Sequence, residues 1–168
     1  CLELIEAHYL FNLPYDKLEM LIHPEALVHS IIEYNNYTSV MNYFYHDMYI
    51  PLFNFFNDVI NEKKYPVLNY KYDFKKNNNL SFFKPNIKQF PILDIFNSIK
   101  KSPKNLIKFN CANEFAVNLF ANKKINFGKI HSIIGESLSL DLKNNVNNIK
   151  NIIDFQNNFI ELLKSKFI

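Results

Sequence analysis

Two glutamates near the start of the chain are spaced so that they could act together in binding or catalysis. Glu3 and Glu6 lie three positions apart in a segment with helical periodicity, so their carboxylates share one face of a helix. Oxygen donors arranged in this way suit a hard divalent cation, or a general acid and base. The same pair also suits a solvated helix start, where the helix dipole stabilises acidic side chains. The spacing alone leaves both interpretations open.

Two histidines flank a predicted turn at Pro24. His23 and His29 could orient a carboxylate or stabilise a developing oxyanion, although most such histidines are hydrogen-bonded structural residues. Asp47 and Met48 follow a predicted strand. They could close a pocket with an acid and an apolar contact, or they could simply form the turn at the strand end.

A polar run further along the chain predicts the start of a helix. Asn110 is a suitable N-cap, and Glu114 is a carboxylate early in the helix that the dipole would favour. Cys111 has no base near it in the sequence, so a cysteine nucleophile is not expected. The chain has two glycines, Gly128 and Gly135, which cannot make a GxGxxG or P-loop phosphate site. The residues by themselves do not define a reaction.

The elements that must position these residues follow from periodicity and turn residues. Residues 2–13 predict a helix, and two β-rich runs around Asn35-Asn36 predict a hairpin. Residues 48–60 predict a second helix, with Pro51 in its first turn. Residues 61–90 have no stable period and predict a linker or long loop. Beyond Pro91, four helical segments joined by short connections predict an antiparallel bundle. These segments lie near residues 92–101, 110–122, 127–138 and 144–167. The expected fold class is therefore α+β, with a helix and short strands followed by a four-helix bundle.

Composition narrows the classes of partner. The chain has 168 residues, 48% hydrophobic and 21% charged, which predicts a folded globular protein. All 19 basic residues are lysine, the net charge is +3 and no basic stripe is present, so we expect no nucleic-acid partner. Two cysteines without zinc spacing are typical of a reducing compartment. No apolar run approaches the roughly 20 residues of a membrane span, so we expect no membrane partner.

A series of short motifs carries a resemblance to a known family. In chain order these are Leu2–Ala7, Leu10–Asn12, Ile22–Pro24, Val28–Ser30, Asp47-Met48, Tyr72–Phe74, Phe90-Pro91 and Asn110–Glu114. With these motifs the chain resembles the 1-deoxy-D-xylulose 5-phosphate reductoisomerase family. The resemblance spans the chain and is strongest over its first fifty residues or so.

The resemblance implies an architecture and a reaction. The chain would be a C-terminal fragment: residues 1–60 the end of the substrate- and metal-binding catalytic domain, 61–90 a linker, and 91–168 the helical C-terminal domain. Such an enzyme converts 1-deoxy-D-xylulose 5-phosphate to 2-C-methyl-D-erythritol 4-phosphate for non-mevalonate isoprenoid synthesis. It uses NADPH and a Mg²⁺ or Mn²⁺ ion. The NADPH-binding domain would lie outside this chain, which therefore supplies no cofactor-binding residue and is expected to be inactive alone.

Three residues take roles from the resemblance. Glu3 matches a metal-ligand glutamate, His29 a histidine that orients groups at the catalytic site, and Met48 a methionine on the substrate-binding wall. The family also implies a phosphorylated sugar substrate, a homodimer, and a location in bacterial cytoplasm or in a plastid or apicoplast stroma. The chain departs from the family pattern at Cys1 (usually Gly), at His46 (usually Pro) and at Asp58-Val59 (commonly Trp-Pro).

Two other classes of function stay open at this point. A noncatalytic helical interaction or scaffold module derived from the enzyme would share the same motifs. Only an intact dinucleotide region and an acidic metal pair upstream would separate the two. A lysine-rich RNA-binding protein is the third possibility, and it predicts steeply salt-dependent binding.

Overall fold

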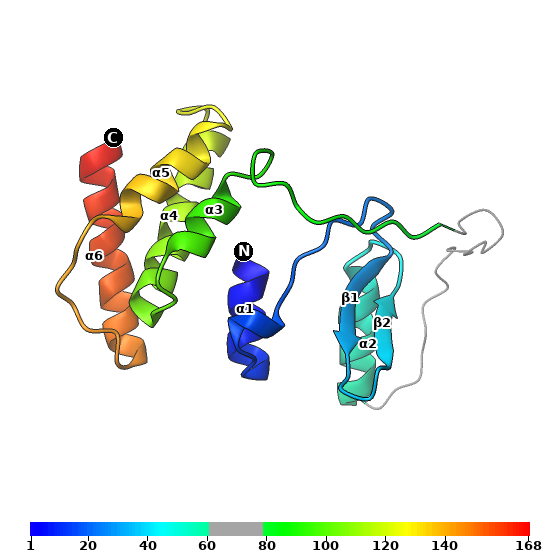
Figure 1. Ribbon diagram of the computed structural model, residues 1–168. Helices are drawn as coiled ribbons and strands as arrows, with labels where there is room; N and C mark the ends of the chain where they lie inside the picture. Colours follow the sequence, from blue (N-terminus) through cyan, green and yellow to red (C-terminus); the bar gives the residue numbers. More distant parts are fainter. Residues whose placement is uncertain (61–78) are drawn as a thin grey trace. The chain divides into compact units, whose positions relative to one another are not determined.

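The computed structural model describes residues 1–60 and 79–168, and Figure 1 shows their elements. Within these ranges the chain forms six α-helices, one short 3-10 helix and one two-stranded antiparallel sheet. The α+β class and the C-terminal helical bundle expected from the sequence are confirmed. In chain order the elements are α1 (Leu2–Phe11), η1 (Tyr15–Lys17), β1 (Val28–Glu33), β2 (Ser39–Tyr43), α2 (Tyr49–Ile60), α3 (Ile92–Ser98), α4 (Pro103–Ala121), α5 (Lys129–Leu138) and α6 (Ile149–Phe167).

The chain divides into two compact units. One, here called the helical unit, comprises Cys1–Glu19 and Asn86–Ile168. The other, here called the hairpin unit, is Met20–Pro85. Each unit is described by itself.

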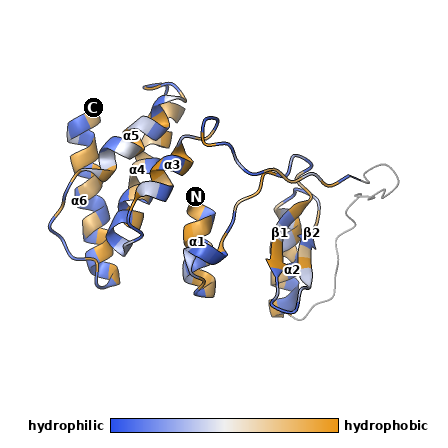
Figure 2. Cartoon of the chain, in the orientation of Figure 1, coloured by the Kyte–Doolittle hydropathy of each residue, from blue (hydrophilic) through white to orange (hydrophobic). Residues whose placement is uncertain are grey.

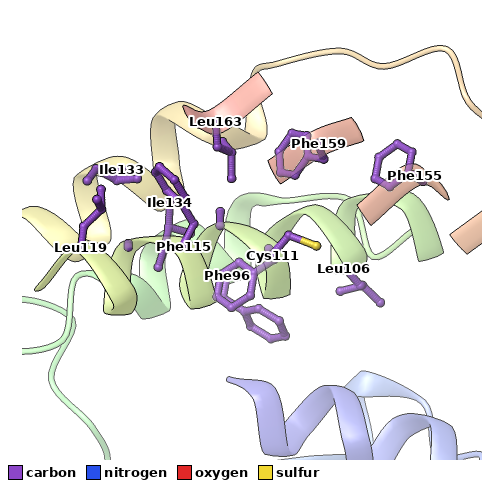
Figure 3. Packing of buried hydrophobic residues seen from close by; sticks show 13 residues of the cluster. Phe96, Leu106, Cys111, Phe115, Leu119, Ile133, Ile134, Phe155, Phe159 and Leu163 are labelled. Carbon is purple, nitrogen blue, oxygen red and sulfur yellow. The ribbon is translucent and has the colours of Figure 1, made fainter. Parts of the chain in front are cut away.

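Helix α4 is the centre of the helical unit, and it packs against both α5 and α6. Its small residues Ala112 and Ala116 are fully buried, which lets neighbouring helices approach closely. Figure 2 shows orange and blue bands alternating along α4 and α6, the pattern of helices with one apolar face. Thirteen buried side chains of this unit form one cluster, and ten of them are labelled in Figure 3.

Helix α6 shows most simply how sequence spacing builds this core. Phe155, Phe159 and Leu163 follow one another at intervals of four, and all three are completely buried. Residues at this spacing lie along one stripe of a helix. The helix begins at the N-cap Asn148, whose side-chain oxygen accepts a hydrogen bond from the backbone N–H of Asn151 at 2.8 Å.

Helix α1 also belongs to the helical unit. None of its residues is fully buried, but Leu2, Leu4 and Ile5 pack against the buried cluster. The predicted helix over 2–13 is confirmed, although it lies with the bundle residues rather than with the hairpin. The domain boundaries expected at residues 60 and 90 concern the longer family protein and stay a prediction. Residues 61–78 of the expected linker, and with them Tyr72–Phe74, lie outside the described residues.

The hairpin unit is built around β1 and β2, which pair antiparallel with Ile31 opposite Met41. Their connection is closed by Asn36, whose side-chain oxygen accepts hydrogen bonds from the backbone N–H and hydroxyl of Thr38. The predicted hairpin is confirmed. The apolar run at 18–23 forms no strand; Ile22 makes only an isolated antiparallel bridge with Phe83.

Helix α4 begins earlier than the polar run at residues 110–114 predicts. Asn110, the expected N-cap, lies inside the helix, which starts at Pro103. Ser102 is the actual N-cap, and its hydroxyl accepts a hydrogen bond from the backbone N–H of Asn105 at 3.4 Å. Pro103 at the first helical position loses no hydrogen bond, because that N–H has no partner in a helix. The predicted start at Asn110 was wrong, because Ser102 and Pro103 begin the helix seven residues before it.

The position of the cap can be tested with two alanine substitutions. We expect Ser102→Ala to lower the free energy of unfolding by about 1 kcal/mol, because it removes a cap. Asn110→Ala should instead raise it by about 0.5 kcal/mol, because alanine is the better residue inside a helix. Urea titrations followed by circular dichroism measure both. If Asn110→Ala lowered the free energy of unfolding and Ser102→Ala did not, Asn110 would be the N-cap.

Candidate metal and substrate site

Glu3 lies in the first turn of α1, and its side chain is exposed. Glu6, one turn later, is exposed as well. The apolar residues Leu2, Leu4 and Ile5 occupy the other side of this helix and contact the core. The helix therefore presents both carboxylates to solvent, as the sequence spacing predicts. Their oxygens are free of the apolar core and accessible to a cation.

The residues present fit a divalent metal only as part of a ligand set. Within residues 1–60 and 79–168, no three His, Cys, Asp or Glu side chains are placed to hold a metal ion. An exposed carboxylate on a helix is nevertheless the type of donor that Mg²⁺ and Mn²⁺ prefer. If such an ion binds, Glu3 can supply one oxygen ligand. The remaining ligands have to come from elsewhere.

His29 lies on β1, where its ring stacks on Phe44 with the ring centroids 3.8 Å apart and an interplanar angle of 14°. Its Nε2 lies 3.0 Å from the carbonyl oxygen of Phe44. A carbonyl can only accept, so Nε2 carries a proton, and in the neutral ring Nδ1 keeps its lone pair. The side chain as a whole is exposed. His29 is thus held in one tautomer with its second nitrogen available to a partner.

Met48 lies just before α2 and is 69% exposed, so its thioether can contact a bound molecule. The preceding Asp47 has a local role. Its Oδ1 accepts a hydrogen bond from the backbone N–H of Tyr49 at 2.9 Å, which satisfies one of the free donors at the start of α2. Of the two interpretations of Asp47, the turn at the strand end is confirmed.

His23 belongs to a network that the sequence analysis did not foresee. Its Nδ1 lies 2.9 Å from the carbonyl oxygen of Ser81 and 3.0 Å from Oε2 of Glu25. The same carboxylate accepts a hydrogen bond from the backbone N–H of Ser81 at 3.2 Å. Hydrogen bonds from the backbone of Glu25 itself and from Ser81 lower the pKa of the Glu25 carboxyl. This network joins two segments far apart in sequence, and only the three-dimensional fold reveals it.

The structure divides the predicted site residues between the two units. Glu3 is in the helical unit, whereas His29 and Met48 are in the hairpin unit. In the hairpin unit, His29 stacks on Phe44, which lies in the segment that leads to Met48. His23 lies in the hairpin unit too and serves it structurally.

Cys111 is 2% exposed and lies in the core of the helical unit, where Figure 3 shows its sulfur among apolar side chains. Burial away from water raises the pKa of its thiol from 9.0 to about 11. A thiol with a raised pKa is a poor nucleophile at neutral pH. The expectation that Cys111 is no nucleophile agrees with this position.

Three lysines of the helical unit, which the sequence analysis treated as scattered charges, bind backbone carbonyls. Lys108 is only 5% exposed, and burial lowers the pKa of its amine. The ammonium groups compensate carbonyl oxygens that helices leave free at their ends and in their connections. Lys101 donates to Phe96 and Ile99, Lys104 to Leu142, and Lys108 to Leu140.

Comparison with known proteins defines the class first: residues 45–161, from the end of the hairpin into α6, match the C-terminal domain of a reductoisomerase. The family model described as "DXP reductoisomerase C-terminal domain" matches residues 45–161. The chain therefore belongs to the 1-deoxy-D-xylulose 5-phosphate reductoisomerase family.

Individual relatives agree with the family match. The reductoisomerase of Sulfurihydrogenibium sp. is 40% identical over 139 residues, which are 82% of this chain and 36% of the relative. That of Clostridium kluyveri is 35% identical over 167 residues, 99% of this chain and 43% of the relative. The chain thus spans about two fifths of the length of the curated relatives it matches.

Solved structures show the same fold. The reductoisomerase of Zymomonas mobilis in complex with NADPH superposes with a TM-score of 0.83 at 29% identity, over 98% of this chain and 43% of that one. A reductoisomerase structure with fosmidomycin and magnesium gives a TM-score of 0.77 at 25% identity, over 98% and 43% of the two chains. Among the helices in the described ranges, none combines the length and apolar character that crossing a membrane requires.

The burial of Cys111 predicts a pH dependence of stability. Because the unfolded thiol has the lower pKa, its contribution is complete below pH 9 and is lost as the pH rises to about 11. Between pH 8 and pH 11 we expect the wild type to lose about 2 kcal/mol more unfolding free energy than Cys111→Ala. Denaturant titrations of both proteins at the two pH values measure the difference, which also cancels the titration of tyrosines and lysines. Equal losses in the two proteins would contradict the burial of the thiol.

Proposed function

We propose that this chain is the metal- and substrate-holding end, together with the helical C-terminal domain, of an enzyme that converts 1-deoxy-D-xylulose 5-phosphate to 2-C-methyl-D-erythritol 4-phosphate. The observation that carries the proposal is the family match over residues 45–161, together with the superposition on the NADPH complex at a TM-score of 0.83. Because the chain covers 43% of that structure, the complete activity belongs to the longer protein.

Glu3 supplies one ligand to the divalent metal in this proposal. Its exposed carboxylate on a helix fixed to the core supports the role, since hard cations take oxygen donors. When bound, Mg²⁺ or Mn²⁺ would polarise the substrate carbonyl and hold adjacent substrate oxygens. Magnesium in the solved relative that also holds fosmidomycin supports the choice of ion.

His29 and Met48 act from the hairpin unit. His29 donates its Nε2–H to the Phe44 carbonyl, so in the neutral ring its Nδ1 lone pair could accept a hydrogen bond from a water or a substrate hydroxyl. Met48 supplies an exposed apolar wall that can exclude water from the reacting carbon. Neither role requires a charge on the side chain.

The reductant and partners follow from the same proposal. NADPH would be bound by the part of the enzyme outside this chain, and the substrate is a phosphorylated sugar. The complete protein would be a homodimer in bacterial cytoplasm, or in a plastid or apicoplast stroma.

The isolated 168-residue chain should show no measurable turnover, because it supplies one metal ligand and no dinucleotide site. Purified chain mixed with NADPH, Mn²⁺ and 1-deoxy-D-xylulose 5-phosphate tests this by absorbance of NADPH. Steady oxidation above a no-protein control would contradict the prediction. In the same assay the complete protein should be active; an inactive complete protein that still folds would favour a scaffold role instead.

In the complete protein, Glu3→Gln should weaken Mn²⁺ binding and reduce turnover far more than Glu6→Gln. An amide is a neutral and poorer ligand for a hard cation, and Glu6 is the matched control on the same exposed helix face. His29→Ala should fall between the two, with a loss of about 10- to 100-fold, as is typical of residues that orient ligands. Mn²⁺ titrations followed by electron paramagnetic resonance, alongside steady-state kinetics, measure these effects. Binding by Glu3→Gln that matches the wild type would remove Glu3 from the metal site.

A further inference from the structure

The position of Glu3 depends on what holds α1, because this helix cannot hold itself. It has ten residues, no fully buried side chain and no side-chain hydrogen bond at its N-cap. A helix of this length is marginal in water unless it packs against other elements. Leu2, Leu4 and Ile5 attach its first turns to the core of the helical unit. An attachment at the first turns alone does not fix the direction of the helix axis, so a second attachment is needed.

The second attachment is an aromatic stack at the other end of α1. His8, in its last turn, lies against Tyr15 with the ring centroids 4.4 Å apart and an interplanar angle of 21°. The His8 ring is itself fixed, since its Nδ1 donates to the carbonyl oxygen of Leu13 at 2.6 Å. The turn after α1, with Asn12 in the left-handed region at φ 52°, brings the chain back so that Tyr15 meets this ring.

Tyr15 joins this stack to the bundle. Its ring meets Phe96 edge to face at 6.1 Å, and Phe96 is 2% exposed in the buried cluster. The ammonium group of Lys101 lies 3.8 Å from the centroid of Phe96 and 5.9 Å from that of Tyr15. Edge-to-face pairs and cation–π contacts are directional, so they fix ring orientation as well as contact. The same ammonium group is held by the carbonyls of Phe96 and Ile99.

We propose that Tyr15 is a positioning residue for Glu3: its ring, held between His8 and the Phe96–Lys101 pair, fixes the axis of the helix that carries the metal ligand. The inference rests on the proposed function of Glu3. The Glu3 carboxylate lies off the helix axis, so a tilt of α1 about its attached first turns changes where that carboxylate points, even though the backbone of these turns stays at the core. Metal–ligand distances in proteins lie within about 0.2 Å of their standard values, so a ligand carboxylate has to be held in place.

The Tyr15 hydroxyl shows whether the ring or a hydrogen bond makes this attachment. It is buried and has no hydrogen-bond partner among the described residues, so the contribution comes from the ring. Phenylalanine keeps the ring and loses only the unpaired hydroxyl, whereas alanine removes the whole attachment. Tyr15→Phe is therefore the conservative variant that should retain function, and Tyr15→Ala the variant that should lose it.

The experiment measures Mn²⁺ affinity by electron paramagnetic resonance, and NADPH affinity by fluorescence, in the complete protein that carries this chain. We expect Tyr15→Ala to weaken Mn²⁺ binding about 10-fold, with NADPH affinity unchanged and Tyr15→Phe like the wild type. Tyr15→Leu, which keeps apolar volume but no ring, should also weaken Mn²⁺ binding and serves if the alanine variant does not fold.

A matched control separates positioning from general loss of stability. Phe167 packs against the same buried cluster and lies 6.2 Å from Phe115, so Phe167→Ala removes an aromatic ring from α6 instead. It should lower the melting temperature and leave Mn²⁺ affinity unchanged. Equal weakening by Phe167→Ala and Tyr15→Ala would overturn the positioning role.

Glu3→Gln in the same titration distinguishes the two proposals. If Glu3→Gln weakens Mn²⁺ binding but Tyr15→Ala and Tyr15→Leu bind like the wild type, the positioning role is overturned and the proposed function stands. If Glu3→Gln itself binds Mn²⁺ like the wild type, the metal site and the positioning role fall together.

Discussion

Burial of the apolar face of α4 is the constraint on which the helical unit depends. Seven of the thirteen buried cluster residues come from this one helix: Leu106, Phe109, Cys111, Ala112, Phe115, Ala116 and Leu119. A 19-residue helix with such a face has to be covered, and α5 and α6 cover part of it. Burial on this scale is the largest favourable term in folding. The lysine-to-carbonyl hydrogen bonds then fix how the connections run over the finished core.

The position of Glu3 in the candidate site depends on this core. Glu3 is exposed, but the residues on either side of it, Leu2 and Leu4, pack against the buried cluster. A carboxylate can be exposed to solvent and still be held in place, because one side of the helix carries it while the other side packs against the core. In the hairpin unit, His29 is held in a comparable way, by a stack and a hydrogen bond that both involve Phe44. In both units, the candidate residues expose their polar atoms on side chains or elements that packing holds in place.

The sequence predicted those parts of the fold that depend on local spacing. The buried residues Phe155, Phe159 and Leu163 recur at intervals of four, and this spacing predicts one face of a helix. The asparagines between the two strands predict the hairpin turn in the same way. The start of α4 could not be inferred from the same signals, because Pro103 both separates elements and opens helices. A serine immediately before that proline was the signal that would have corrected it.

The candidate site was less accessible to sequence analysis for a physical reason. The roles of Glu3, His29 and Met48 were predicted from a family resemblance, because carboxylates, imidazoles and thioethers often have only structural roles. Within each unit, other contacts join residues far apart in sequence, such as His23 with Ser81 in the hairpin unit and Tyr15 with Phe96 in the helical unit. Periodicity does not encode such pairs, because each depends on how completed elements pack. Tyr15 itself lies in a short turn after α1, where a single aromatic residue gives no periodic signal. Its partner Phe96 and the cation Lys101 come from the second segment of the helical unit, which begins at Asn86. A residue that positions another through packing thus becomes visible only when the fold has brought both to one place.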